Sequence, residues 1–535
     1  MTAGDRQPGT TLDRRRFLER AAAFGVALPV AGSFLAACAG DDGSTVGEIG
    51  GELKMRLVAD ITTLDPAVFA NTSADEPPMA SVFEGLVTFD PYADGFTVVN
   101  QLAESFEASA DGLKYDFTLK PGVPFHGGYG EVTAEDVKFS YERIAGLTTP
   151  KVESPYSGDW IALKEVVVKD KYSGTIVLKE PFAALLRTTL PVTSGYVISK
   201  KAAEELGDKF GTRPIGTGPY EFVSRTPKQN VKMRRFAEYG TGFVDQTWES
   251  ITFLPIDADN AADIALETGD VDFAQVSLQS VDRFTDNDQF GLSQRVTLAY
   301  TWIGMNVLHP KLTDPNVRRA IIAAVNVPSM IEAAFEGRQE QATAILPESM
   351  GLGYWADAPL YERDVDQAQE LLQTAGVSSL DLTYTYTEEP GANEVAEILQ
   401  ANLADVGINL TLQKEESGVY YELGERLKER QLFWGNYETQ PDPSWSMVWF
   451  TCDQIDEWNW MYWCDEEFDR LQAASLKEPD QAKRNEAYIE MQKIWDEAAH
   501  TVWLSWPTKH FAYKNGLAPA ITPHGRVLPQ AFSRA

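Results

Sequence analysis

The sequence is poor in the residues that build metal clusters and disulfide frameworks. Three cysteines and five histidines occur in 535 residues. These numbers exclude a small disulfide-dense protein and leave little material for a His/Cys metal cluster, so we expect no metal site and no cofactor. Basic residues are scarce as well, with 46 Lys and Arg against 79 Asp and Glu and a formal net charge of −33. A chain this acidic is repelled by phosphate backbones, which argues against a nucleic-acid partner.

Catalytic sequence motifs are also missing. The sequence contains no G-x-S-x-G elbow, H-E-x-x-H helix, P-loop lysine or C-x-x-C pair. The five histidines are dispersed along the chain at His126, His309, His500, His510 and His524. We therefore predict that the protein is not an enzyme. The alternative that stays open is a secreted, membrane-tethered hydrolase whose nucleophile and base lie far apart in the sequence.

The sequence has no long apolar run, and the apolar stretch near its N-terminus is short. Ala21–Ala37 has seventeen uncharged residues, whereas a membrane span needs about 20. It follows Arg14–Leu18 (RRRFL), and a charged start before a short apolar stretch is typical of an export signal. The Arg-Arg-x-Phe-Leu core resembles a twin-arginine signal, although Asp13 replaces the Ser or Thr of that pattern.

The end of this stretch, Leu35-Ala36-Ala37-Cys38, looks like a bacterial lipoprotein box. We predict a signal peptide over residues 1–37, a lipidated Cys38 and a flexible tether over residues 38–51, which is rich in glycine. The alternative is an ordinary cysteine in a signal that is cut nearby. The predicted location is the outer face of the cytoplasmic membrane, in the periplasm or cell-wall space, with lipid as the only membrane contact.

The remaining chain is rich enough in apolar residues to bury a large core, because 44% of residues are hydrophobic and 11% aromatic. Alternation predicts strands over residues 51–58 and 115–119. Helical spacing and capping residues predict helices from Thr133 and over residues 314–325, 366–375 and 481–499. In the last of these we expect Ile489, Ile494 and Trp495 on the inner face. No repeat of 20–50 residues is present, so the fold class is mixed α/β.

Several segments resemble the extracellular solute-binding proteins of the peptide and nickel ABC importers, of the large three-domain type. The matching segments, in chain order, are Thr62–Pro66 (TTLDP), Phe83–Val87 (FEGLV), Leu102–Ser105 (LAES), Phe117–Gly128 (FTLKPGVPFHGG), Thr133–Val137 (TAEDV), Pro214–Tyr220 (PIGTGPY), Ala265–Asp272 (ALETGDVD), Asp314–Ala320 (DPNVRRA) and Ala368–Gly376 (AQELLQTAG). Most of these residues form turns and caps, so they specify the scaffold rather than the ligand.

The resemblance implies a two-lobed periplasmic-binding-protein-like fold with an additional N-terminal subdomain. We expect lobe I at 52–296 plus 505–535, with the subdomain inserted at about 67–195, and lobe II at 297–504. It also implies capture of a peptide or peptide-like solute between the lobes and delivery to ABC permease subunits and their ATPases. We expect the protein to act as a monomer. A non-peptide solute, such as an opine, a sugar or a metal complex, stays open.

Tryptophan gathers in one region: six of the thirteen lie between residues 434 and 463. Large rigid aromatic side chains are favoured in binding clefts, although each could instead belong to the core. In the family, the segment before a Pro-Asp-Pro-like motif lines the cleft, and in this chain that segment is 433–443. The residues that we expect to bind ligand are Trp302, Trp434, Asn436, Tyr437, Glu438, Asp442, Trp445, Trp458 and Trp460.

Many peptide-binding members carry an aspartate just before this motif, which pairs with the α-amino group of the peptide. Here Thr439 is the closest positional match. Glu438 or Asp442 could supply the charge instead, because a buried ammonium needs a paired carboxylate. Whether an α-amino group is recognised therefore stays open.

Cys452 and Cys464 lie in the same aromatic region. In an exported protein such a pair is expected to form a disulfide that holds Trp458 and Trp460 in place. Two free buried thiols are the alternative.

Overall fold

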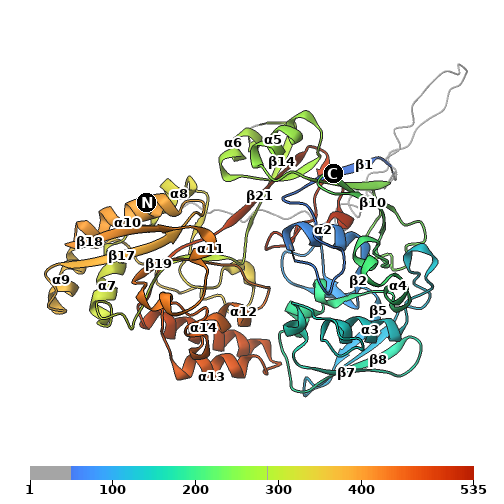
Figure 1. Cartoon of the computed structure of the whole chain (residues 1–535), viewed down its shortest axis with the longest axis horizontal. Helices are drawn as coiled ribbons and strands as arrows, with labels where there is room; N and C mark the ends of the chain where they lie inside the picture. Colours follow the sequence, from blue (N-terminus) through green and yellow to red (C-terminus); the bar gives the residue numbers. More distant parts are fainter. Residues whose placement is uncertain (1–49, 71, 286) are drawn as a thin grey trace, which may run out of the picture. The chain divides into compact units, whose positions relative to one another are not determined.

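The computed structural model describes residues 50–70, 72–285 and 287–535 (Figure 1). The predicted signal peptide, Cys38 and the tether up to residue 49 lie outside the described residues. Within the described part of the chain, no helix is both long and apolar enough to cross a membrane.

The larger sheet combines strands from both ends of the described chain. Its strands, in spatial order, are β10 (Tyr220–Thr226), β11 (Asn230–Arg235), β12 (Ser250–Pro255), β1 (Glu52–Leu57), β13 (Phe273–Val276), β21 (Thr508–Lys514) and β14 (Phe290–Val296). The predicted first strand is confirmed as β1, which runs parallel to β12 and β13. Its residues Leu53, Met55 and Leu57 are buried, and α5 (Asp259–Thr268) packs against β13. A short helix, α6 (Val281–Thr285), packs against β14.

A second sheet is built from the middle and late part of the chain. Its strands, in spatial order, are β16 (Glu340–Gln341), β20 (Thr501–Trp506), β15 (Tyr300–Met305), β19 (Leu432–Tyr437), β17 (Leu380–Thr387) and β18 (Ile408–Glu415). β17 runs parallel to both of its neighbours, β18 and β19. Around this sheet lie α7 (Pro315–Ala324), α8 (Val327–Phe335), α9 (Val365–Thr374) and α10 (Ala392–Ala404). α10 packs against β18 and α8, and α7 packs against α9.

The chain passes between these two sheets at two adjacent points. β14 ends at Val296 in the larger sheet, and β15 begins at Tyr300 in the second sheet. On the way back, Pro507 alone separates β20 from β21. The two passages are joined, because both the backbone N–H and the hydroxyl of Thr297 donate to the Pro507 carbonyl oxygen at 2.8 Å.

A third sheet is formed within residues 103–178. Its order is β5 (Ala103–Ala108), β6 (Lys114–Leu119), β8 (Ser173–Leu178) and β7 (Leu163–Val168). The predicted strand and helix of this region are confirmed as β6 and α3 (Ala134–Ile144). α3 begins with a capping box between Thr133 and Asp136, which satisfies orphan N–H groups of its first turn.

Two of the family-like segments meet beside α2 (Thr72–Val82). Gly216 and Gly218 lie so close to the end of α2 that an added Cβ would come within 2.1 Å and 2.5 Å of the Val82 and Ser81 carbonyl oxygens. Only glycine fits such a close backbone approach. Next to them, Glu84 is buried and accepts hydrogen bonds from the hydroxyls of Thr217, Tyr239 and Thr241. These segments are therefore structural.

The C-terminal helical hairpin corrects one expectation. α13 (Glu466–Ser475) packs against α14 (Gln481–Glu497), and α14 lies where the sequence predicts it. Trp495 is buried and the half-buried Ile494 packs against the core, as expected, but Ile489 is half-buried and lies outside the core cluster. The inner face instead carries Arg484, Tyr488, Met491 and Gln492. Apolar spacing misses this face because two of its buried side chains are polar and satisfied by hydrogen bonds.

Candidate functional site

The predicted ligand-binding segment begins in the middle of the second sheet, on β19. This strand pairs with β15 on one side and β17 on the other. Gly435 faces Trp302 across the β15 pairing, and a Cβ at Gly435 would lie 2.1 Å from the indole ring. Trp302 therefore packs directly on the β19 backbone and is buried. At the end of β19, Asn436 is half-buried and Tyr437 is buried.

A pocket of about 290 Å³ lies at the end of β19. Its lining residues are Tyr421, Asn436, Tyr437, Glu438, Trp449 and Trp458. The pocket is largely aromatic, with a few polar groups converging on it, which is the usual composition of a small-molecule site.

Three rings of the pocket pack edge to face. The ring centroids of Tyr437, Trp449 and Trp458 lie 5.6–6.3 Å apart, and the ring planes meet at 63–83°. The Tyr437 hydroxyl donates to the Trp458 backbone oxygen at 2.7 Å. Trp449 and Trp458 are half-buried, so both present ring surface to the pocket.

Glu389 lies next to this pocket. The Trp434 and Asn436 side-chain N–H groups each donate to Glu389 Oε2 at 2.8 Å, and the Tyr421 hydroxyl donates to Oε1. Burial raises the pKa of Tyr421, and the hydrogen bond to Glu389 and the charge of this carboxylate raise it further. Tyr421 therefore remains a neutral O–H donor.

Sequence reasoning did not identify Glu389, Trp449 or Tyr421 as site residues. The sequence does carry a signal for Glu389. Alternation in Leu380–Thr387 (LDLTYTYT) indicates a strand, which is β17 in the structure, and Glu389 follows its end. β17 and β19 run parallel, so their carboxyl ends meet at one edge of the sheet. Ligands of open α/β sheets bind at such edges.

The expected ligand residues fall into two groups in the structure. Asn436, Tyr437, Glu438 and Trp458 line the pocket. Trp445 is half-buried beside Trp449, with the ring centroids 6.4 Å apart. The remaining expected residues lie in the core: Trp302, Trp434, Trp460 and Asp442, each no more than 1% exposed.

Asp442 is therefore not carried into the candidate site. Its carboxylate accepts two hydrogen bonds from Arg484, at 2.7 and 2.9 Å, and caps α12 (Pro443–Met447) by accepting from the Ser444 N–H. A charge that is already paired and inaccessible cannot also bind a solute ammonium. Glu438 is exposed and pairs with Lys509 of β21 at 3.3 Å, and Thr439 is buried.

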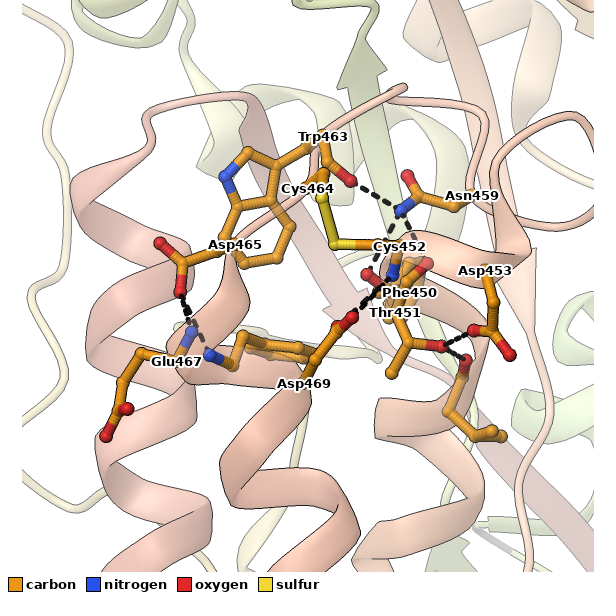
Figure 2. Close-up of a disulfide and its surroundings, with 12 residues drawn as sticks. Phe450, Thr451, Cys452, Asp453, Asn459, Trp463, Cys464, Asp465, Glu467 and Asp469 are labelled. Carbon is orange, nitrogen blue, oxygen red and sulfur yellow. Dashed lines mark hydrogen bonds between the residues drawn. A yellow bond between two sulfur atoms is a disulfide. The ribbon is translucent and has the colours of Figure 1, made fainter.

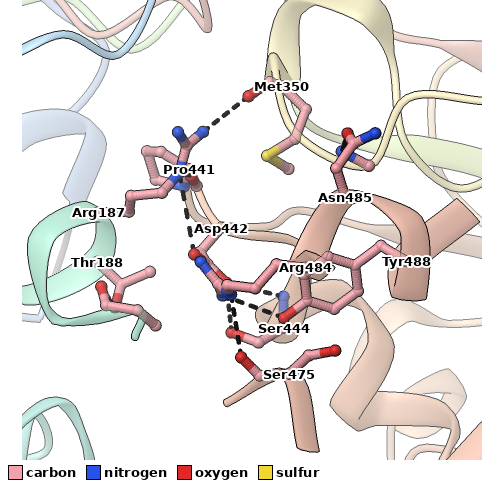
Figure 3. A network of polar contacts seen from close by, with 12 residues as sticks. Arg187, Thr188, Met350, Pro441, Asp442, Ser444, Ser475, Arg484, Asn485 and Tyr488 are labelled. Carbon is pink, nitrogen blue, oxygen red and sulfur yellow. Dashed lines mark hydrogen bonds and ion pairs between the residues drawn. The ribbon is translucent and has the colours of Figure 1, made fainter. Parts of the chain in front are cut away.

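Arg187 joins the loop that follows the pocket to an N-terminal segment (Figure 3). It lies in the helical turn η3 (Leu185–Thr189). Its guanidinium donates to the backbone oxygens of Pro441 and Met350 and lies 3.9 Å from the Asp442 carboxylate. Two segments that lie far apart in the sequence, 185–189 and 441–442, are thus held together by a buried polar network.

The disulfide between Cys452 and Cys464 is present, and it closes the loop that carries Trp458 (Figure 2). Inside the loop, the Asn459 side-chain amide donates to the backbone oxygens of Phe450, Thr451 and Trp463. The Cys452 N–H donates to the Asp469 carboxylate of α13. The disulfide and these hydrogen bonds fix the position of Trp458 at the pocket.

The histidines do not form a site in the structure. Burial lowers the pKa of His126 to about 4 and the pKa of His500 and His524 to about 3, so these side chains are neutral. Among residues 50–70, 72–285 and 287–535, no three His, Cys, Asp or Glu side chains are grouped so that they could hold a metal ion.

The sheets and the pocket define a two-lobed α/β protein of the periplasmic-binding-protein class with an additional N-terminal subdomain, as the sequence predicts. Residues 97–458 match the family model described as bacterial extracellular solute-binding proteins, family 5 middle. Because the match spans more than half of the chain, the protein belongs to this family.

Similar proteins agree with this assignment. The glutathione-binding protein GsiB of Pectobacterium atrosepticum is 28% identical over 85% of this chain and 88% of its own length. The structure of HbpA2 from Haemophilus parasuis has a TM-score of 0.82 and 24% identity, covering 91% of this chain and all of that chain. MoaA from A. tumefaciens R10, in complex with mannopinic acid, has a TM-score of 0.69 and 27% identity, covering 90% of this chain and 99% of its own.

Proposed function

We propose that the protein is the substrate-binding lipoprotein of an ABC importer and that it captures a peptide or peptide-like solute. The observation that carries this proposal is the aromatic pocket at the carboxyl edge of β17 and β19, in a chain that belongs to a solute-binding family. Two named ligands of similar proteins support the peptide class: glutathione for GsiB and the peptide STSA for DppA of Helicobacter pylori. Mannopinic acid, bound by MoaA, is an opine and favours the alternative of a non-peptide solute.

The proposed mechanism is capture by closure of two lobes. Lobe I consists of 52–296 plus 505–535, with an inserted subdomain at about 67–195, and lobe II consists of 297–504. The hinge would lie at the two hydrogen-bonded passages, Thr297 and Pro507, since backbone rotation at a few loop residues is enough for closure. The closed monomer delivers the solute to the permease, whose ATPase subunits drive import. Cys38 carries the lipid that keeps the protein at the outer face of the cytoplasmic membrane.

The test uses the purified full chain. Mass spectrometry of material released by denaturation identifies any solute that has co-purified. In parallel, thermal unfolding is measured with glutathione, the dipeptide Met-Leu, the tetrapeptide STSA and mannopinic acid. A true ligand at one hundred times its Kd stabilises the protein by about 2.7 kcal/mol. For a body of roughly 490 residues this corresponds to a Tm increase of about 3 °C.

The same samples separate a binding protein from the tethered hydrolase. A binding protein returns the solute chemically unchanged after long incubation, whereas a hydrolase converts it steadily. Conversion, or the absence of any bound or stabilising solute, contradicts the proposal. For the anchor, the Cys38→Ser variant is expected in the soluble fraction of cells, and retention of this variant in the membrane contradicts lipidation at Cys38.

A further inference from the structure

The Glu389 carboxylate lacks a cationic partner in the described part of the chain. Its three hydrogen-bond donors, Tyr421, Trp434 and Asn436, are all neutral groups. No Lys, Arg or His side chain of residues 50–70, 72–285 and 287–535 forms an ion pair with Glu389 within 4.0 Å. Such an arrangement holds a negative charge in a fixed position.

Three other acids of this region are paired with cations. Glu438 pairs with Lys509, Glu388 pairs with Lys414, and Glu415 pairs with Arg430. The Arg430 guanidinium also stacks on Trp460, 4.6 Å from the ring centroid, and is buried. Its charge is therefore used within the protein. Glu389, which accepts hydrogen bonds from the lining residues Tyr421 and Asn436, has no such cation among the described residues and is left to attract a charge from outside.

The pocket walls suit the same kind of ligand group. None of its lining residues is Lys, Arg or His, so the described walls offer no cation to a carboxylate or phosphate. The rings of Tyr437, Trp449 and Trp458 are steeply inclined to one another. Aromatic faces carry the negative end of a quadrupole and attract ammonium and guanidinium groups within about 6 Å.

We propose that the pocket selects solutes with a positively charged nitrogen, and that Glu389, at the turn between β17 and α10, is the residue that confers this selectivity. The inference rests on the proposed function and adds the chemical class of the group bound. It places the charge on a different element from the segment 436–443, where the family resemblance leads one to look for it. Asp442 is buried in its pair with Arg484, and the exposed Glu438 pairs with Lys509.

The test compares two adjacent glutamates. Glu389→Gln removes the charge and keeps a carbonyl oxygen for the Trp434 and Asn436 donors. Glu388→Gln is the matched control, since that side chain is exposed and pairs with Lys414 at 3.4 Å. The probes are Met-Leu and glutathione, each with its N-acetylated form, which lacks the cation. Affinities are measured by calorimetry, together with those of any co-purified solute.

The wild type and the Glu388→Gln variant are expected to bind the free-amine probes about 10- to 100-fold more tightly than the N-acetyl forms, the range for a hydrogen bond to a charged group. In Glu389→Gln this discrimination is expected to disappear. A residue that only positions Asn436 and Tyr421 would weaken both forms of each probe equally, and that result overturns the proposal.

Two further outcomes separate this inference from the proposed function. If the wild type binds neutral or acidic solutes as tightly as the free amines, or co-purifies with a solute that has no cationic nitrogen, the cation selectivity is wrong and solute binding stands. If the wild type neither co-purifies with a solute nor binds any, both the proposed function and the cation selectivity are contradicted. Should Glu389→Gln fail to fold, the ratio of wild-type affinities for the free-amine and N-acetyl probes still tests the cation selectivity of the pocket.

Discussion

Replacing Arg484 by Met tests whether the buried pair with Asp442 holds the pocket loop in place. The Asp442 carboxylate is fully buried and Arg484 is 2% exposed. Arg484 also donates to the Ser475 backbone oxygen and to the Tyr488 hydroxyl, so one side chain joins the pocket loop to both α13 and α14. Met fills much of the same volume, and the substitution therefore removes charge and hydrogen bonds rather than packing.

The expected loss follows from what Asp442 keeps. In the variant, its carboxylate retains the Ser444 donors and Arg187 at 3.9 Å, but loses two charged hydrogen bonds. Leaving a buried charge without its partner costs about 3–5 kcal/mol. Unfolding entropy is about 2.1 cal/mol/K per residue, so a body of roughly 490 residues loses about 1 °C of Tm per kcal/mol. We expect Tm to fall by about 3–5 °C.

The assay is thermal and urea unfolding of the wild type, Arg484→Met, Asp442→Asn and the double variant. The double variant removes both charges, so its loss is expected to be smaller than the sum of the two single losses by about 0.5–3 kcal/mol. A drop of less than about 1 °C for Arg484→Met, or strictly additive losses, would refute the view that this pair is a coupled structural element.

Three further predictions concern the pocket wall and the scaffold. Trp458→Ala is expected to weaken solute binding with little change in stability, whereas Trp460→Ala is expected to lower the unfolding free energy by about 3–5 kcal/mol, as loss of a core aromatic does. Calorimetry measures solute binding and urea unfolding measures stability; equal effects of the two variants would contradict the placement of Trp458 in the pocket and Trp460 in the core. Replacing Cys452 and Cys464 by Ser is expected to cost about 3 kcal/mol for a loop of this length, measured by unfolding in oxidising buffer with the reduced wild type as control; an unchanged midpoint would contradict it. Burial raises the pKa of Glu84 from 4.5 to about 7 in the folded protein, so the stability that the protonated carboxyl contributes is complete below pH 4.5 and is lost as the pH rises through 7. Relative to Glu84→Gln, the wild type is therefore expected to lose about 3 kcal/mol of unfolding free energy between these pH values. Equal pH dependence of unfolding in the two proteins would contradict the raised pKa.

The elements that local chemistry determines could be predicted from the sequence. The helix after Thr133 and the helix after Asp314 begin with capping side chains, and both are present as α3 and α7. The disulfide could be predicted because two cysteines lie close together in a chain expected to be exported. Each of these predictions uses residues near one another in the sequence.

Burial of individual aromatic side chains could not be predicted in this way. Trp458 and Trp460 are two residues apart, yet one lines the pocket and the other lies in the core. The difference depends on packing against Tyr420 and Phe433, which come from other elements. The same holds for Asp442, whose partner Arg484 lies 42 residues further along the chain.

Glu389 can be distinguished from its neighbour Glu388 once the order of the strands is known. In the sequence Glu389 is one of two adjacent glutamates before Pro390, and nothing in the local sequence distinguishes it from Glu388. Topology separates them: β17 runs parallel to β19, so the turn after β17 meets the end of β19, where Asn436 lies. Only Glu389 bonds to that strand, and Glu388 pairs with Lys414 of β18 instead. The strand order places Glu389 next to the pocket, and the ion pairs of the neighbouring acids leave it without a cationic partner among the described residues.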